Sequence, residues 1–433
     1  MSIISTSKDA NINYLCKIIK IKNLVKHPNA DRLQTTSIDF NNVIVGADTK
    51  EGDVCAYFPI EAQINKELLS SINSFRKKEL NKDKEAVGFF EDKGRVRAVK
   101  LRGERSMGVV FPLEQLEKFT GKDLKDYVGQ EFDTIGDILI CKKYVVPVRG
   151  GSLSGGKNGK IVKRISRLVD LQFRFHIDTE NLRKNAYKIK QDDVIDISYK
   201  VHGSSFIVSN VLVKRKLNLF EKIFRKFGVN IEDKEYDVLW ASRRVVKNQF
   251  ETAKKNDFYG YDIWGEIANE IKEFIPKGYT VYGEVCGYTN DGGYIQKLYD
   301  YNCAPGKHRI FVYRITFTNT DGQVFNLSTM QMREFCVKMG LECVPLFFYG
   351  KAKDVFPEIK EGEHWHEEFI KKLEEKYTDK DCYICANKVS EEGIVLRKEK
   401  FDEFEAYKLK GFAFLENESK QLDSGEVDIE SVN

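Results

Sequence analysis

Short runs in which apolar and polar residues alternate dominate the first third of the chain. Examples are YLCKIIKI, NNVIVGAD, GDVCAYFPI, RVRAVKLRG and MGVVFPL, with turn residues between them. Short strands at this spacing are typical of a small antiparallel barrel or sandwich. We therefore expect an all-β domain over residues 1–150, interrupted by a helix near residues 66–80.

From residue 163 the strand-like runs lengthen and helical stretches appear between them, as at 262–274 and 364–376. This pattern predicts an α+β domain over residues 163–415. The Gly-rich stretch over residues 151–162 has no hydrophobic period and predicts a linker. The acidic end of the chain, residues 416–433, has few large apolar side chains and predicts a disordered tail.

The segment KRKLNLFEKIFRKFG, residues 214–228, has helical periodicity. Phe220, Ile223, Phe224 and Phe227 recur at i, i+3, i+4 and i+7, with basic residues around them. We interpret it as a surface helix with one buried stripe, and an RNA-contacting helix is the alternative.

Composition narrows the class of protein. The 433 residues include 70 Lys and Arg against 66 Asp and Glu, so the net charge is only +4 and any nucleic-acid surface must be local. A hydrophobic fraction of 42% and only 8 Pro exclude collagen-like and wholly disordered classes. No apolar run is long enough to span a bilayer and no signal peptide is visible, so we expect a cytoplasmic or nuclear protein without membrane contact. The nine Cys look like reduced thiols.

One stretch of the second domain combines a strand pattern with a chemically active residue. In DVIDISYKVHGSSFIVSNVLVK a β-rich run ends at Lys200, turns through His202 and Gly203, and continues as another strand. A lysine held at such a turn becomes a nucleophile when nearby cations lower its pKa. Further charged and aromatic residues follow on strand-like runs, at Glu284, Tyr313, Glu392, Lys408 and Lys410.

These residue types suit attack on the α-phosphorus of ATP, which needs a neutral amine, a cation and a leaving pyrophosphate. Lys200 supplies the amine. Glu284 and Glu392 suit Mg²⁺, which takes one or two carboxylates and keeps several waters. Lys408 and Lys410 share one face of a strand, where they attract phosphate and lower the pKa of Lys200. Each residue alone also fits a structural role, but together they indicate a phosphate site.

The order of these motifs resembles the covalent lysyl-nucleotidyltransferase superfamily of ATP-dependent ligases and capping enzymes. The sequence K-x-H-G-S-S-F around Lys200 is most similar to the RNA ligase 2-like branch, and the resemblance covers residues 173–414. It implies an adenylation domain of ATP-grasp-like antiparallel sheets with flanking helices. It also implies ATP and Mg²⁺ or Mn²⁺ as cofactors, and joining of RNA 3′-OH and 5′-phosphate ends through lysyl-AMP.

The resemblance also assigns residues to the nucleotide. Tyr313 matches the aromatic residue that stacks on adenine, although Arg314 replaces the acidic residue that follows it in the family. SRRVVKN offers Arg243 for the nucleotide, which we favour, and Arg244 for RNA. His176, in FRFHIDTENLRK, lies in an adenosine-side segment or is a structural histidine. The implied ATP and AMP ligands are Lys200, His202, Gly203, Arg243, Glu284, Tyr313, Glu392, Lys408 and Lys410, of which Glu284 and Glu392 hold the metal.

The first domain has its own signal. VKHPNADRL, residues 25–33, resembles the turn motif of OB-type tRNA-binding modules, and an N-terminal OB-like module also occurs in one subgroup of RNA ligases. We therefore expect an OB-like RNA-binding barrel, in which the HPNADRL motif itself is a structural turn. Lys100, Arg102 and Arg105, near a Gly turn, are candidate phosphate contacts.

Two alternatives remain open. A non-catalytic RNA- or tRNA-binding factor fits the first domain, and a GTP-using mRNA guanylyltransferase fits the lysine motif. Because about 18 residues follow Leu415, we expect no C-terminal OB domain, which argues against DNA ligases and capping enzymes. We infer RNA ends as partners and no obligate protein partner.

Overall fold

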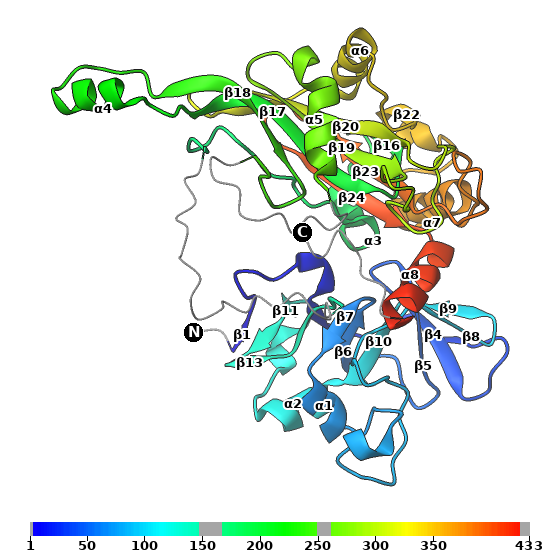
Figure 1. The fold of residues 1–433 in the computed structure, drawn as a ribbon. Coiled ribbons are helices and arrows are strands. Elements are labelled where there is room, and N and C mark those ends of the chain that lie inside the picture. Colours follow the sequence, from blue (N-terminus) through cyan, green and yellow to red (C-terminus); the bar gives the residue numbers. More distant parts are fainter. Residues whose placement is uncertain (1–2, 147–166, 249–260, 425–433) are drawn as a thin grey trace.

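The structure is a computed structural model that describes residues 3–146, 167–248 and 261–424. Two lobes are visible in Figure 1, an N-terminal lobe in blue and cyan and a C-terminal lobe in green to orange, with the red helix α8 (Phe412–Ser424) between them. The linker expected over residues 151–162 lies outside the described residues. No helix among the described residues has the length and apolar character needed to cross a membrane.

The N-terminal lobe consists of short strands that pair antiparallel. Its main sheet has the order β10-β6-β2-β11, and β3, β4 and β5 form a second, meandering sheet. The core between strands and helices includes Ile18, Phe58, Phe132 and Leu69. The strands are β1 (Ile4–Ser5), β2 (Cys16–Lys20), β3 (Val25–Lys26), β4 (Leu33–Ile38), β5 (Asn41–Gly46), β6 (Val54–Pro59), β7 (Ala62–Ile64), β8 (Val99–Leu101), β9 (Glu104–Ser106), β10 (Gly108–Pro112), β11 (Glu131–Phe132), β12 (Thr134–Ile135), β13 (Ile138–Leu139) and β14 (Cys141–Lys143).

Two short helices, α1 (Lys66–Ser71) and α2 (Leu113–Thr120), interrupt this lobe. The single helix expected over residues 66–80 is wrong in length. Asn73 adopts a left-handed backbone with φ of 56°, which an α-helix cannot continue through, and a separate 3-10 turn follows at Lys78–Leu80.

The C-terminal lobe contains two five-stranded sheets, with the orders β15-β24-β23-β16-β22 and β18-β17-β19-β20-β21. All strand pairs are antiparallel except β15 with β24. The predicted α+β class with antiparallel sheets is therefore confirmed. The strands are β15 (Glu180–Asn181), β16 (Val194–Tyr199), β17 (Ser204–Lys214), β18 (Lys234–Ala241), β19 (Tyr279–Gly287), β20 (His308–Thr318), β21 (Val324–Asn326), β22 (Leu346–Lys351), β23 (Gly393–Lys398) and β24 (Glu405–Lys410).

Helices cover these sheets as the sequence pattern predicts. Helix α7 (Trp365–Tyr377) packs its apolar face on the first sheet, and α5 (Ile263–Ile271) does so on the second, where Trp264 is fully buried. The helices expected at 262–274 and 364–376 are thus confirmed. The remaining helices are α3 (Leu182–Asn185), α4 (Leu219–Lys226) and α6 (Thr329–Met339).

The lysine-bearing turn connects the two sheets of this lobe. Strand β16, in the first sheet, ends at Tyr199, and β17, in the second, begins at Ser204. The backbone N–H of Lys200 donates to the carbonyl of Gly393 at the start of β23. Lys200 therefore lies where residues of both sheets converge.

The expected disordered tail is wrong for residues 416–424, which belong to α8. Phe412 and Leu415 pack against Ala98 and Met107 of the N-terminal lobe. Leu422 packs against Tyr144 and Val146 of the same lobe. Acidic composition misled the prediction, because the few apolar side chains of this segment all find partners far away in the sequence.

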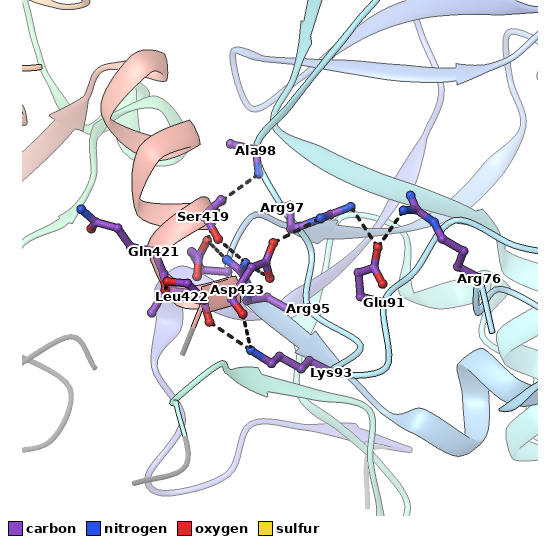
Figure 2. A network of polar contacts seen from close by, with 12 residues as sticks. Arg76, Glu91, Lys93, Arg95, Arg97, Ala98, Ser419, Gln421, Leu422 and Asp423 are labelled. Carbon is purple, nitrogen blue, oxygen red and sulfur yellow. Dashed lines mark hydrogen bonds and ion pairs between the residues drawn. The ribbon is translucent and has the colours of Figure 1, made fainter. Parts of the chain in front are cut away.

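A polar network fixes α8 to the N-terminal lobe (Figure 2). Arg95, whose side chain is 1% exposed, donates to Glu61 at 2.7 Å and to Asp423 at 2.6 Å. It also donates to the carbonyl of Ser419 at 2.7 Å, and Arg97 donates to Asp423 at 3.2 Å. The two lobes are thus joined by a buried charge cluster as well as by apolar contacts.

Helix α4 differs from the expectation of a buried stripe. It lies at the tip of the long β17–β18 hairpin, away from the rest of the lobe in Figure 1. Phe220, Ile223, Phe224 and Phe227 are all exposed. The surface helix is confirmed, but its apolar face has nothing in the described chain to pack on.

Candidate active site

A pocket opens at the junction of the two sheets and the N-terminal lobe. It is lined by most of the residues that the motifs single out, although these are up to 234 positions apart in the sequence. The ones that line it are Lys200, His202, Arg243, Glu284, Tyr313, Glu392, Lys408 and Lys410, together with His176.

Glu392 is the centre of the charge arrangement. It precedes β23, and its carboxylate is held between two lysines: Oε2 lies 3.0 Å from Lys200 Nζ, and Oε1 lies 3.1 Å from Lys410 Nζ. His202 Nδ1 lies 3.5 Å from the same Oε2. Although burial favours protonation, the charges of Lys200 and Lys410 and the hydrogen bond from His202 hold the pKa of Glu392 well below its usual range. The carboxylate is therefore ionised at neutral pH.

Glu284 is the second buried carboxylate of the pocket. It lies on β19 opposite Ser205 of β17, whose hydroxyl donates to its Oε1 at 2.9 Å. Glu284 and Glu392 are 7% and 4% exposed. Glu284 and Glu392 line the same pocket, and carboxylate oxygens are the ligands that Mg²⁺ and Mn²⁺ prefer.

Tyr313 and His176 form the aromatic part of the pocket. The Tyr313 hydroxyl lies 2.9 Å from His176 Nδ1, and the two rings meet edge to face. Burial raises the pKa of Tyr313, so its phenol stays neutral. Arg314, the next residue on β20, instead donates to Asn326 at 2.9 Å and lies over the ring of Phe404. Arg314, which replaces the acidic residue of the resembling ligases, therefore packs beside the pocket and does not line it.

The two arginines of the SRRVVKN motif lie in different environments. Arg243 lines the pocket and donates to Asp178 at 2.6 Å. Arg244 is 66% exposed at its side chain and lies 3.6 Å from the other oxygen of Asp178. Asp178 thus orients the arginine that we favoured for the nucleotide.

Gly203 does not line the pocket, but it explains the turn. A Cβ at this position would lie 2.4 Å from the carbonyl oxygen of Val285 on β19. The resemblance implies Gly203 as an ATP ligand, but the close approach that this glycine allows is to the neighbouring strand. This packing places Lys200 and His202 beside β19.

The basic residues proposed for RNA in the N-terminal lobe lie elsewhere. Arg105 forms an ion pair with Asp379 at 2.5 Å and lies over the ring of Phe412, so it joins the lobes. Arg102 occupies a left-handed turn position, and its carbonyl accepts from Asn29 at 2.9 Å. Lys100 is exposed on β8. No contact of these three residues reaches the pocket lining among the described residues.

The HPNADRL motif is a structural turn, in line with our interpretation. The ring of His27 is buried, with Nδ1 accepting from the backbone N–H of Asn29 and Nε2 lying 3.2 Å from the carbonyl of Leu101. The turn therefore braces the β8–β9 hairpin through Leu101 and Arg102. Asp31 contributes little to the turn, because its side chain is 97% exposed and lies 3.4 Å from Lys26 Nζ.

Sequence reasoning missed the pocket residues that come from the N-terminal lobe and from α8. Lys143 follows no motif, and Glu418 lies in the segment that we expected to be disordered. Glu418 Oε1 is 3.1 Å from Lys410 Nζ. The other residues of this group are Asn11, Tyr14, Glu61, Tyr144 and Leu422. No local sequence pattern marks any of these residues as part of the pocket.

Comparison with known proteins agrees with this geometry. The family model for RNA ligase matches residues 194–410, which is half of the chain, and a model for an OB-fold domain matches residues 15–113. No curated protein sequence matches significantly.

The solved structures that resemble this fold include several of the Naegleria gruberi RNA ligase. A lysine-to-methionine variant with AMP and Mn superposes with a TM-score of 0.56 at 17% identity, covering 93% of this chain and 98% of that one. A glutamate-to-alanine variant with ATP and Mn gives a TM-score of 0.58 at 15% identity, covering 93% and 99%. The same ligase with pyrophosphate gives 0.54 at 16% identity, covering 94% and 99%. With a family model over half of its length and these motifs gathered in one pocket, the chain belongs to the RNA ligase family.

Proposed function

We propose that this protein is an ATP-dependent RNA ligase that joins 3′-OH and 5′-phosphate RNA ends through a covalent lysyl-AMP on Lys200. The observation that carries the proposal is the triad of Lys200, Glu392 and Lys410, with Nζ–O distances of 3.0 and 3.1 Å, inside a pocket that also holds Lys408 and Glu284. This set combines a nucleophile, cations for phosphate and carboxylates for a metal.

In the first step the Lys200 amine, after losing a proton, attacks the α-phosphorus of ATP. A P–N bond forms, the P–O bond to pyrophosphate breaks, and pyrophosphate leaves. In the second step an oxygen of the RNA 5′-phosphate attacks the phosphorus of the bound AMP, the P–N bond breaks, and Lys200 leaves as the free amine. In the third step the 3′-OH attacks this adenylated end and AMP is released. Lys408 and Lys410 attract the phosphate oxygens in each step.

The cofactor assignment rests on the site and on the relatives. Several of the Naegleria ligase structures contain ATP or AMP together with Mn. In this chain Glu284 and Glu392 would hold Mg²⁺ or Mn²⁺, which neutralises phosphate charge when bound. Tyr313 with His176 would receive the adenine, and Arg243, oriented by Asp178, would contact the nucleotide.

We divide the chain into an OB-fold module over residues 1–150 and an adenylation domain over residues 163–415. We propose that the RNA substrate contacts both. The OB-fold match supports the first assignment. Helix α8 extends the adenylation domain, and its Glu418 and Leu422 complete the pocket beside Glu61 and Tyr144 of the OB-fold module.

The test is labelling with ATP that carries ³²P at the α-phosphate, with Mg²⁺ or Mn²⁺, and with GTP in parallel. The protein is first treated with pyrophosphate to remove bound AMP. We expect an acid-labile label from ATP that Lys200→Ala loses and that Lys190→Ala, at an exposed lysine ten residues upstream, retains. A label from GTP alone would indicate a guanylyltransferase. No label from either nucleotide would indicate a non-catalytic RNA-binding factor.

A further inference from the structure

The β17–β18 hairpin starts and ends at the active site. Strand β17 begins four residues after Lys200, and β18 ends two residues before Arg243. The strands pair continuously from Ile207 with Ala241 to Lys214 with Lys234. At about 3.3 Å per residue, the outer end of β17 lies roughly 30 Å along the strand from Ser204. The hairpin thus extends from the pocket to a remote tip that carries α4 (Figure 1).

The tip presents large apolar side chains to solvent. Phe220, Phe224 and Phe227 are 71%, 52% and 82% exposed, and Leu219 and Ile223 are 70% and 42% exposed. Contiguous clusters of exposed apolar side chains often mark binding sites for other molecules. A partner is therefore expected here.

Local interactions stabilise the helix, although no residue of the described part of the chain covers its apolar face. Asn218 and Glu221 form a reciprocal capping box, with distances of 2.8 and 2.7 Å. Arg215 pairs with Glu221 at 2.8 Å, and Arg225 pairs with Asp233 at 3.1 Å. An isolated helix of eight residues is marginal in water, and these contacts offset that weakness. These local contacts keep the segment helical, so the apolar side chains are presented on one ordered face.

Charge selects the partner. Residues 214–229 contain six basic side chains and one acidic one, Glu221. The basic residues are Lys214, Arg215, Lys216, Lys222, Arg225 and Lys226. Arg215 and Arg225 are paired with Glu221 and Asp233, and the returning strand adds Glu232, Glu235 and Asp237. The cations left to complement a polyanion are therefore the four lysines Lys214, Lys216, Lys222 and Lys226. Aromatic rings beside cations are the arrangement that binds single-stranded nucleic acid, because bases stack on the rings while phosphates contact the cations.

We propose that the α4 tip, defined as residues 214–229, is a distal RNA-binding site that holds the substrate strand away from the ends being joined. The proposal rests on the function proposed above. Because stacked nucleotides rise about 3.4 Å each, a tip roughly 30 Å from the pocket contacts RNA roughly nine nucleotides from the ligation site. Phe220, Phe224 and Phe227 stack on bases, and Lys222 and Lys226 contact phosphates.

The first experiment compares RNA lengths. The triple variant Phe220→Ala, Phe224→Ala and Phe227→Ala is tested in sealing of pre-adenylated RNA whose arms are 5 or 20 nucleotides long. We expect the KM for the long RNA to rise about tenfold or more, with the short RNA unchanged. ATP labelling of Lys200 should also remain unchanged, because the tip is remote from the nucleotide. Phe274→Ala, at another exposed phenylalanine, is the matched control and should affect neither RNA.

The second experiment locates the contact directly. RNA carrying 4-thiouridine at eight to ten nucleotides from the end should crosslink to the α4 tip, and RNA carrying it at two nucleotides should not. Equal KM values for wild type and triple variant on long RNA, or crosslinks that avoid the tip, would overturn the proposal. The proposal would also be overturned if the tip bound anionic vesicles or mediated self-association while the triple variant still sealed long RNA normally. Absence of ATP labelling in the wild type would instead refute the proposed ligase function itself.

Discussion

Lys200 Nζ lies 3.0 Å from Glu392 Oε2, so the proposed nucleophile is paired with a carboxylate. We expected cations alone to govern this lysine, through Lys408 and Lys410. The structure instead places a buried anion against it, which stabilises the ammonium form. The amine can become neutral only when this ion pair is released, and Glu392 is also the residue suited to hold a metal.

The first prediction concerns this carboxylate. Glu392→Gln should lower the rate of lysyl-AMP formation by about 100-fold or more, because it leaves Lys200 and Lys410 without their shared counter-charge and removes a proposed metal ligand. Single-turnover labelling with ATP measures the effect. The control is Glu391→Gln, since Glu391 is equally buried but does not line the pocket. Similar losses for both variants would contradict a specific role of Glu392.

The second prediction concerns the contact between the lobes shown in Figure 2. Arg95→Ala should destabilise the docked α8 by about 3–5 kcal/mol, because it leaves the carboxylates of Glu61 and Asp423 without their buried partner. Urea unfolding and hydrogen exchange at α8 report the change.

The same network offers a matched control in Arg76→Ala. Arg76 pairs with Glu91 at 2.9 Å, but the two side chains are 57% and 35% exposed. An exposed pair contributes at most about 1 kcal/mol, so this variant should unfold close to the wild type. If both variants behaved alike, burial of the Arg95 cluster would be irrelevant to stability.

The third prediction concerns Gly203. Gly203→Ala should cost about 1–3 kcal/mol of unfolding free energy, because its Cβ would meet the backbone of Val285 at 2.4 Å. The displaced turn should also slow lysyl-AMP formation. Thermal unfolding measures the first effect. Gly121→Asn is the control, since a side chain there has no neighbour within 4 Å and asparagine tolerates its φ of 66°.

The fourth prediction is a pH dependence centred on Asp196. Burial, which outweighs the attraction of Arg397, raises the pKa of Asp196 to about 6. The pKa of an unfolded aspartate is about 4. Between about pH 4 and pH 6 the folded state therefore binds more protons than the unfolded state, and the free energy of unfolding falls as the pH rises through this range. Asp196→Asn should therefore gain stability relative to the wild type between about pH 4 and pH 7. Urea midpoints at four pH values test this, and parallel pH curves for the two proteins would contradict it.

The active-site lysines and carboxylates were predictable because each stands at or next to a strand with a clear alternating pattern. Lys200 follows β16, Glu284 lies within β19, and Lys410 ends β24. Local hydrophobic patterns report such strands, and the motif spacing reports their order. Their roles in the reaction remain predictions, while their convergence in one pocket is a property of the structure.

Other features could not be read from local pattern. Residues 416–424 of helix α8 were expected to be disordered because their composition is acidic, and the helix's partners Ala98 and Tyr144 lie some 300 residues earlier. The apolar stripe of α4 was expected to be buried, since periodicity shows which face is apolar but not whether anything covers it. Both errors concern contacts between distant segments.

By itself, the sequence determined the chemical groups, the antiparallel α+β architecture and the two-domain order, because these depend on residue type and on short-range periodicity. Only the tertiary structure decided that Glu392 pairs with Lys200 and that Glu418 of α8 reaches Lys410. It also decided that the N-terminal lobe closes the pocket and that the α4 tip is left exposed. These outcomes depend on how separate surfaces fit together, which no local pattern encodes.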